Sequence, residues 1–131
     1  MSTDYGITIH KFAERHFIKS FEKKYKGAWD TTWKAVEEEF KRFDSLSETS
    51  IAEIITDRDN IKICKTEFRV AGTKESRKSS GNRCIVAIHK DTRMVHVLLV
   101  YHKNHLGHGN ETAKWKQVIR DNYPEYTCLT P

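Results

Sequence analysis

Two apolar runs in the second half of the chain constrain the fold more than any other feature. RCIVAIHK (residues 83–90) and RMVHVLLVYHK (residues 93–103) are separated only by Asp91 and Thr92. Runs rich in Val and Ile that are joined by so short a link predict an antiparallel β-hairpin. Because residues 97–100 are apolar on both faces of the strand, we expect this strand near the centre of a sheet that helices cover on one side.

A helical hairpin is predicted before the strands. Aromatic residues recur every fourth position between residues 14 and 27, where Gly27 is expected to end the first helix. Asp30 is expected to cap the second helix. The two apolar stripes consist of Phe17, Phe21 and Tyr25, and of Trp29, Trp33, Val36, Phe40 and Phe43. Aromatic stripes at helical spacing are far more often core than a base-stacking surface, so we interpret the tryptophans as structural.

The remaining elements complete an α+β pattern. Alternation predicts strands over residues 5–12 and 61–70, and ETAKWKQVIRDNY (residues 111–123) predicts a terminal helix that ends before Pro124. Residues 51–55 are too short a run to assign, and residues 71–82 form a polar, basic loop. We therefore expect one domain over residues 1–131, with an N-terminal helical hairpin packed on a small antiparallel sheet and a short C-terminal helix.

Positive charge is concentrated in the second half of the chain. Residues 62–103 contain ten Lys or Arg and three Asp or Glu, which gives a net charge of +7. Because the whole chain has a net charge of +5, the remaining residues have a net charge of −2. Such clustering favours a polyanionic partner such as nucleic acid, although a solvated basic face would produce the same pattern.

Several classes of protein are disfavoured by what the sequence lacks. Cys64, Cys84 and Cys128 are odd in number and far apart, unlike the paired cysteines of a disulfide framework or a zinc site. The first ten residues lack the pattern of a signal peptide, and no apolar segment approaches membrane-spanning length. We therefore expect a soluble, cytoplasmic protein that does not engage a membrane.

The segments KTEFRVAGTKESRKSSGNRCIVAI (residues 65–88) and MVHVLLVYHKNH (residues 94–105), placed after a helical hairpin, resemble the RelE/ParE toxin superfamily. They most resemble its RelE-like ribonuclease branch, found in type II toxin-antitoxin systems. By order of elements the resemblance covers residues 7–123. It implies a RelE-like fold and cleavage of messenger RNA without metal or cofactor, usually on the ribosome. It also implies that a cognate antitoxin holds this activity in check.

The same resemblance assigns candidate site residues by position. Lys65, Glu67 and Arg69 fall on the basic strand, Arg83 follows the small-residue turn, and Lys103 is near the end of the last strand. Glu67 departs from RelE itself, which has lysine there.

The chemistry of RNA cleavage supports a similar set of residues. Attack by the RNA's own 2′-hydroxyl needs a base, an acid for the leaving 5′-oxygen, and positive charge on the phosphate. Arginine suits the phosphate best, and histidine titrates nearest neutrality. The candidate catalytic residues are Lys65, Glu67, Arg69, Arg83, His102, Lys103 and His105. The candidate RNA-binding residues are Lys74, Arg77, Lys78 and Tyr101.

Purely structural roles are an alternative explanation for several of these residues. Lys65, Glu67 and Arg69 could form an exposed ladder of ion pairs, and Tyr101 could pack beneath the helices instead of stacking on a base. His102, His105 and His108 are three residues apart, but the glycines around His108 argue against a helix there, so we expect no metal site. Two other functions stay open: a non-catalytic ParE-like toxin that binds a topoisomerase, and a degenerate RelE-like member without activity.

Overall fold

A computed structural model describes residues 4–106 and 109–129 and contains a five-stranded sheet. The strands are β1 (Gly6–Ile9), β2 (Ala52–Arg58), β3 (Ile61–Phe68), β4 (Asn82–His89) and β5 (Met94–His102). They lie in the order β1-β5-β4-β3-β2. The pairs β2–β3, β3–β4 and β4–β5 are antiparallel, and the pair β1–β5 is parallel. The α+β class is confirmed, whereas the expectation of a purely antiparallel sheet is wrong.

The parallel pair has a simple origin in the chain connections. Short links make β2 with β3 and β4 with β5 antiparallel hairpins, because the two residues 59–60 and the four residues 90–93 can only reverse the chain, whereas the longer link from β3 to β4 contains α5. No such link joins β1 to β5, since the helices and three strands separate them in sequence. β1 is therefore free to pair in parallel with β5, where Ile7 lies opposite Val95.

The predicted helical hairpin is present with different boundaries. Its first arm consists of α1 (Lys11–Ala13), a π-helical turn η1 (Glu14–Ile18) and α2 (Lys19–Lys24); its second arm is α3 (Ala28–Lys41), followed by α4 (Phe43–Leu46). The predicted cap is wrong. Gly27, with φ of 80°, precedes α3, whereas Asp30 lies inside its first turn. A glycine adopts this positive φ without the steric cost of a side chain, which explains the sharp change of direction.

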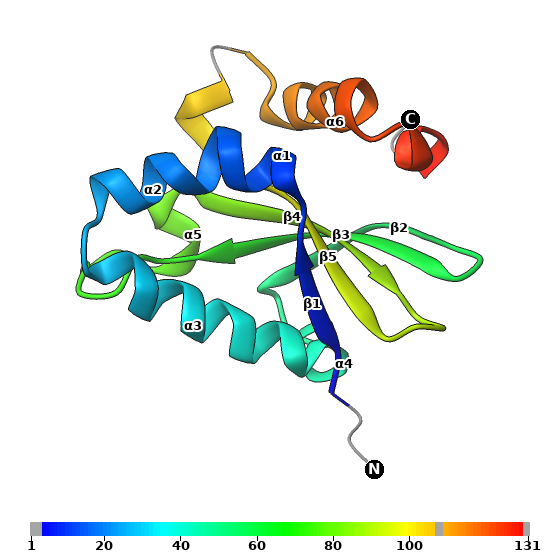
Figure 1. The fold of residues 1–131 in the computed structure, drawn as a ribbon, viewed down its shortest axis with the longest axis horizontal. Coiled ribbons are helices and arrows are strands. Elements are labelled where there is room, and N and C mark those ends of the chain that lie inside the picture. The colour runs from blue at the N-terminus through cyan, green and yellow to red at the C-terminus, as the bar shows by residue number, and fades with distance from the viewer. Residues whose placement is uncertain (1–3, 107–108, 130–131) are drawn as a thin grey trace.

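Helices cover both faces of the sheet (Figure 1). On one face, called here the α3 face, Trp29, Trp33 and Phe40 are buried in a cluster with strand residues such as Val86. On the opposite face, called the α6 face, Trp115 and Ile119 of α6 (Glu111–Asn122) are buried with residues such as Ile85, Leu99 and Tyr123. The burial of the tryptophans in α3 confirms their structural interpretation.

Four short elements were not predicted. β2 is the outer strand of the sheet and begins within the run left unassigned, α5 (Arg77–Ser80) lies within the basic loop, and η2 (Lys103–Leu106) follows β5. A short 3₁₀ segment, η3 (Pro124–Leu129), extends the chain beyond α6. Over the described residues, no helix has the length and apolar character needed to cross a membrane.

An irregularity in β5 decides which residues reach the α6 face. Ile85 pairs with Leu99 and Val86 pairs with Val97, so Leu98 is an extra residue that forms a bulge. Leu98 and Leu99 both belong to the core of the α6 face. Strand alternation is reset at this bulge, so Val97 lies on the α3 face and Tyr101 on the α6 face.

Candidate functional site

The sheet register brings three strand residues into one row on the α6 face. Glu67 of β3 is the pairing partner of Arg83 of β4, and Arg83 in turn pairs with Tyr101 of β5. Lys65 lies two positions before Glu67 and therefore shares its face. The expected convergence of the charged strand with the two ends of the hairpin is thus present for these four residues.

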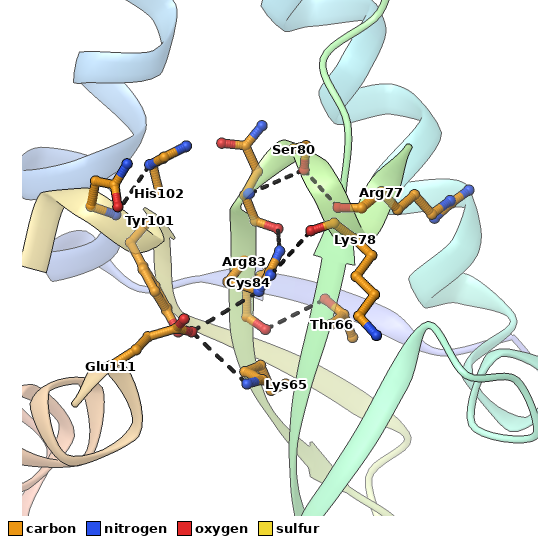
Figure 2. A network of polar contacts seen from close by, with 12 residues as sticks. Lys65, Thr66, Arg77, Lys78, Ser80, Arg83, Cys84, Tyr101, His102 and Glu111 are labelled. Atoms are coloured by element: carbon orange, nitrogen blue, oxygen red, sulfur yellow. Dashed lines mark hydrogen bonds and ion pairs between the residues drawn. The ribbon is translucent and has the colours of Figure 1, made fainter. Parts of the chain in front are cut away.

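Glu111, the first residue of α6, completes this group. Its Oε2 accepts a hydrogen bond of 2.7 Å from the Tyr101 hydroxyl, and it lies 3.8 Å from Lys65 Nζ and 4.0 Å from Arg83 Nε. Figure 2 shows the three side chains directed at the same carboxylate. We call Lys65, Glu67, Arg83, Tyr101 and Glu111 the cation cluster.

Arg83 is fixed within the cation cluster by backbone groups. Only 7% of this residue is exposed, and its guanidinium donates hydrogen bonds to the carbonyls of Asn82 at 3.1 Å and of Lys78 at 3.3 Å. A buried charge is stabilised only where its donors have acceptors and a group of opposite charge lies nearby. Here the two carbonyls accept the hydrogen bonds, and Glu111 supplies the negative charge. The guanidinium is therefore held in one orientation before any ligand binds.

The turn before Arg83 is built by small polar residues. Ser76 and Ser79 form a reciprocal capping box at the start of α5, and Gly81 ends α5 in the left-handed conformation with φ of 77°. The Ser80 hydroxyl lies 2.6 Å from the Phe68 carbonyl and accepts a hydrogen bond from the Asn82 amide. These contacts tie α5 to the end of β3 and the start of β4, which explains why this sequence positions Arg83.

Tyr101 does not offer a stacking surface. Its side chain is fully buried in the core of the α6 face, and burial together with the Glu111 carboxylate strongly raises the pKa of its hydroxyl. The hydroxyl therefore stays protonated and donates to Glu111. The proposed role of Tyr101 as an RNA-stacking residue is wrong for this conformation, and its observed role is to position Glu111.

The two candidate histidines lie away from the cation cluster. His102 pairs with Asn82, one position after the Arg83–Tyr101 pair, and alternation directs it to the α3 face. There it lines a small cavity with Phe21, Lys24 and His105, whose ring centroid is 5.3 Å from that of His102. The expectation that these histidines converge with Arg83 on one surface is therefore wrong.

The two histidines also differ from one another. His102 Nδ1 accepts a hydrogen bond of 3.1 Å from the Asn104 amide, and burial is the main cause that lowers the pKa of His102. Both features favour its neutral form, which suits a structural role in holding the turn after β5. His105 is exposed.

The other basic candidates lie outside the cation cluster. Arg69 follows β3 and is exposed, lining a groove of about 210 Å³ beside α3. Arg77 lines the same groove and forms an ion pair of 2.8 Å with Glu39 of α3. The exposed candidates are Lys74, Lys78 and Lys103. Arg69 is therefore separated from Lys65 and Glu67, the residues with which alternation had grouped it.

A second group of titratable residues was not anticipated. His10, His89 and His96 gather near η3, where His10 Nε2 lies 3.0 Å from His96 Nδ1 and His89 Nε2 lies 2.7 Å from the Tyr126 hydroxyl. The rings of His89 and His96 are 4.2 Å apart. Burial lowers the pKa of both His10 and His96, and the neighbouring His89 adds to this effect. His89 and His96 lie on the two strands of the predicted hairpin, but His10 is 86 residues before His96, so no local pattern could have indicated the whole group.

Neither the cysteines nor the carboxylates form a metal centre within the described residues. No three His, Cys, Asp or Glu side chains of this part of the chain converge as metal ligands; His108 lies outside the described residues. Cys64 and Cys84 are buried free thiols, and burial raises the pKa of Cys64 to about 12. Both thiols are therefore protonated and unreactive near neutral pH.

Glu111 is the member of the cation cluster that the sequence did not single out as functional. Its proximity to Lys65 and Arg83 depends on how α6 packs across the sheet, which leaves no signal in the residues around it. Comparison with known proteins adds no further assignment: no protein-family model matches the chain, and no match is found among curated proteins or solved structures.

Proposed function

We propose that this protein is a RelE-like endoribonuclease, the toxin of a type II toxin-antitoxin system, which cleaves messenger RNA in association with the ribosome by attack of the 2′-hydroxyl. The observation that carries the proposal is the cation cluster. Two cations and two carboxylates from β3, β4 and α6 meet at one end of the sheet. The concentration of positive charge in residues 62–103 supports a polyanionic substrate.

The geometry favours a specific division of roles. Arg83 and Lys65 would bind the scissile phosphate and stabilise the negative charge that it gains, because arginine presents several donors to phosphate oxygens. Glu67 is the half-buried carboxylate in the same row, and no ion pair or side-chain hydrogen bond joins it to another described residue. It would therefore act as the base that takes the proton from the 2′-hydroxyl.

The proton for the leaving 5′-oxygen would come from the same face of the sheet. The Lys65 ammonium group beside Arg83 is partly exposed and would supply this proton. The Tyr101 hydroxyl, by contrast, is buried and donates to Glu111, and His102 lies on the opposite face. Lys74, Lys78 and Lys103 are exposed at the surface and would contact the RNA backbone outside the cleavage site.

The test is inducible expression in a bacterial host, with growth and messenger RNA 5′ ends as readouts. Arg83→Ala would also remove hydrogen bonds to two backbone carbonyls, so Lys65→Ala and Glu67→Gln are the cleaner variants. Wild type should arrest growth and create new RNA ends, and both variants should lose them while remaining folded. Lys34→Ala, an exposed substitution on α3, is the control and should behave as wild type.

Each other outcome has a defined meaning. Growth arrest with intact messenger RNA would contradict the ribonuclease proposal and favour a protein target such as a topoisomerase. Soluble wild-type protein that causes no arrest would contradict an active toxin and favour a degenerate member. New RNA ends that persist in both variants would refute the assignment of the cation cluster as the active site.

A further inference from the structure

The position that a phosphate would occupy in the cation cluster is already held by a carboxylate of the chain. Glu111 Oε2 is the common partner of Tyr101, Lys65 and Arg83 (Figure 2). Its two cations remain at 3.8 and 4.0 Å, beyond direct hydrogen-bonding distance. The carboxylate thus neutralises the cations without using the donors that a phosphate could engage.

The guanidinium of Arg83 retains capacity for a second anion. Its Nη1 and Nη2 atoms each donate to one backbone carbonyl, and a guanidinium carries five N–H donors. An RNA phosphodiester, like a carboxylate, carries one negative charge shared by two oxygens. It could therefore take the place of Glu111 between Arg83 and Lys65, and it could approach both cations more closely than the 3.8 and 4.0 Å of the carboxylate.

The structure of α6 allows Glu111 to leave without disrupting the core. The buried anchors of α6 are Trp115 and Ile119, one and two turns beyond Glu111. Thr112 and Ala113, which follow Glu111 in the first turn, are exposed. The first turn is thus held to the sheet mainly through the Glu111 carboxylate, and its displacement would cost few apolar contacts.

We propose that Glu111 is an internal substitute for an RNA phosphate: it occupies the anion-binding position of Arg83 and Lys65 in the free protein, and RNA binding displaces it together with the first turn of α6. The first turn of α6 then acts as an autoinhibitory latch, a device that rests on the proposed function. The free protein is closed, and substrate binding opens the site.

The decisive experiment measures RNA affinity with and without this carboxylate charge. The probe is a fluorescent single-stranded RNA whose riboses carry 2′-O-methyl groups, so that binding is measured without cleavage. Glu111→Gln keeps an acceptor for Tyr101 but removes the competing charge. Glu48→Gln changes the net charge equally at an exposed site after α4, outside the candidate RNA-binding residues, and is the matched control.

Glu111→Gln should bind this RNA roughly tenfold more tightly than wild type, the change expected from removing one competing charge-assisted contact. Glu48→Gln should change the affinity by less than about twofold, because an exposed charge away from the RNA is screened by salt. A gain in affinity cannot come from misfolding, which would weaken binding. Equal affinities of the two variants would overturn the latch.

The proposed function can fail separately in the same assay. If Glu111→Gln binds the modified RNA more tightly but neither it nor wild type cleaves ribose-containing RNA on ribosomes, the latch stands and the ribonuclease proposal fails. If wild type cleaves RNA and Glu111→Gln gains no affinity, the ribonuclease stands and the latch fails. If no variant binds RNA, both proposals are overturned.

Discussion

Gly81→Ala tests the turn that positions Arg83. Gly81 has φ of 77°, and a Cβ atom added there would lie 2.6 Å from Nε2 of His102. The His102 ring cannot move aside freely, because its Nδ1 accepts a hydrogen bond from the Asn104 amide. The substitution therefore combines an unfavourable backbone conformation with a steric clash.

The expected destabilisation can be assembled from these contacts. Placing alanine in the left-handed region costs about 1–2 kcal/mol. Moving His102 out of its rotamer and away from Asn104 costs a further ~1–2 kcal/mol. Gly81→Ala should therefore lower the free energy of unfolding by about 2–4 kcal/mol, the sum of the two contributions.

Gly72→Ala separates the two contributions. Gly72 also has a positive φ, 86°, but an added Cβ would meet no atom within 4 Å. This variant should lose only the backbone cost of about 1–2 kcal/mol. Urea denaturation of both variants, compared through midpoints and slopes, measures the difference. Equal losses in the two variants would refute the contact between Gly81 and His102.

Three further predictions concern groups that the fold buries. Burial lowers the pKa of His10 and His96 below the usual 6.5, so the folded state binds protons less readily than the unfolded state. The stability that the two neutral histidines provide is therefore complete above pH 6.5, and it falls as the pH drops below 6.5 through the folded-state pKa. Urea midpoints at pH 7.5 and 5.5 should show this loss, and His96→Gln should reduce it; an unchanged pH dependence in that variant would contradict the assignment. Tyr101→Phe removes the donor to the partly exposed Glu111 and should cost about 1–2 kcal/mol of unfolding free energy, whereas a neutral result would show that the hydrogen bond contributes little. Ser80→Ala leaves buried backbone groups without a partner and should cost about 1–3 kcal/mol in the same assay, and a loss below ~0.5 kcal/mol would argue against its bridging role.

Local patterns predicted the elements well where burial follows one regular period. The aromatic stripe of α3 and the apolar residues of α6 repeat at helical spacing, and both helices form nearly where expected. The hairpin also predicted that Arg83 and the residues from Tyr101 onward lie at the same edge of the sheet, although the register set by the turn alone would place Val100, not Tyr101, opposite Arg83.

Features that depend on distant segments could not be predicted in this way. The parallel pairing of β1 with β5 has no local signal, because it joins residues about 90 positions apart in sequence. The bulge at Leu98 shifts alternation by one residue and so decides that Tyr101, and not His102, reaches the α6 face. The candidate site was therefore grouped correctly for Lys65, Glu67 and Arg83, and incorrectly for the histidines.

The most direct test of the central claim is whether cleavage requires the 2′-hydroxyl and the cation cluster together. After the cut sites are mapped, a messenger RNA carrying one 2′-deoxynucleotide on the 5′ side of the main site is incubated with ribosomes and purified protein. We predict that cleavage at that site disappears, that the unmodified RNA yields a 2′,3′-cyclic phosphate end, and that Glu67→Gln cleaves neither. Equal cleavage of the deoxy-substituted and unmodified sites would contradict 2′-hydroxyl attack at the cation cluster.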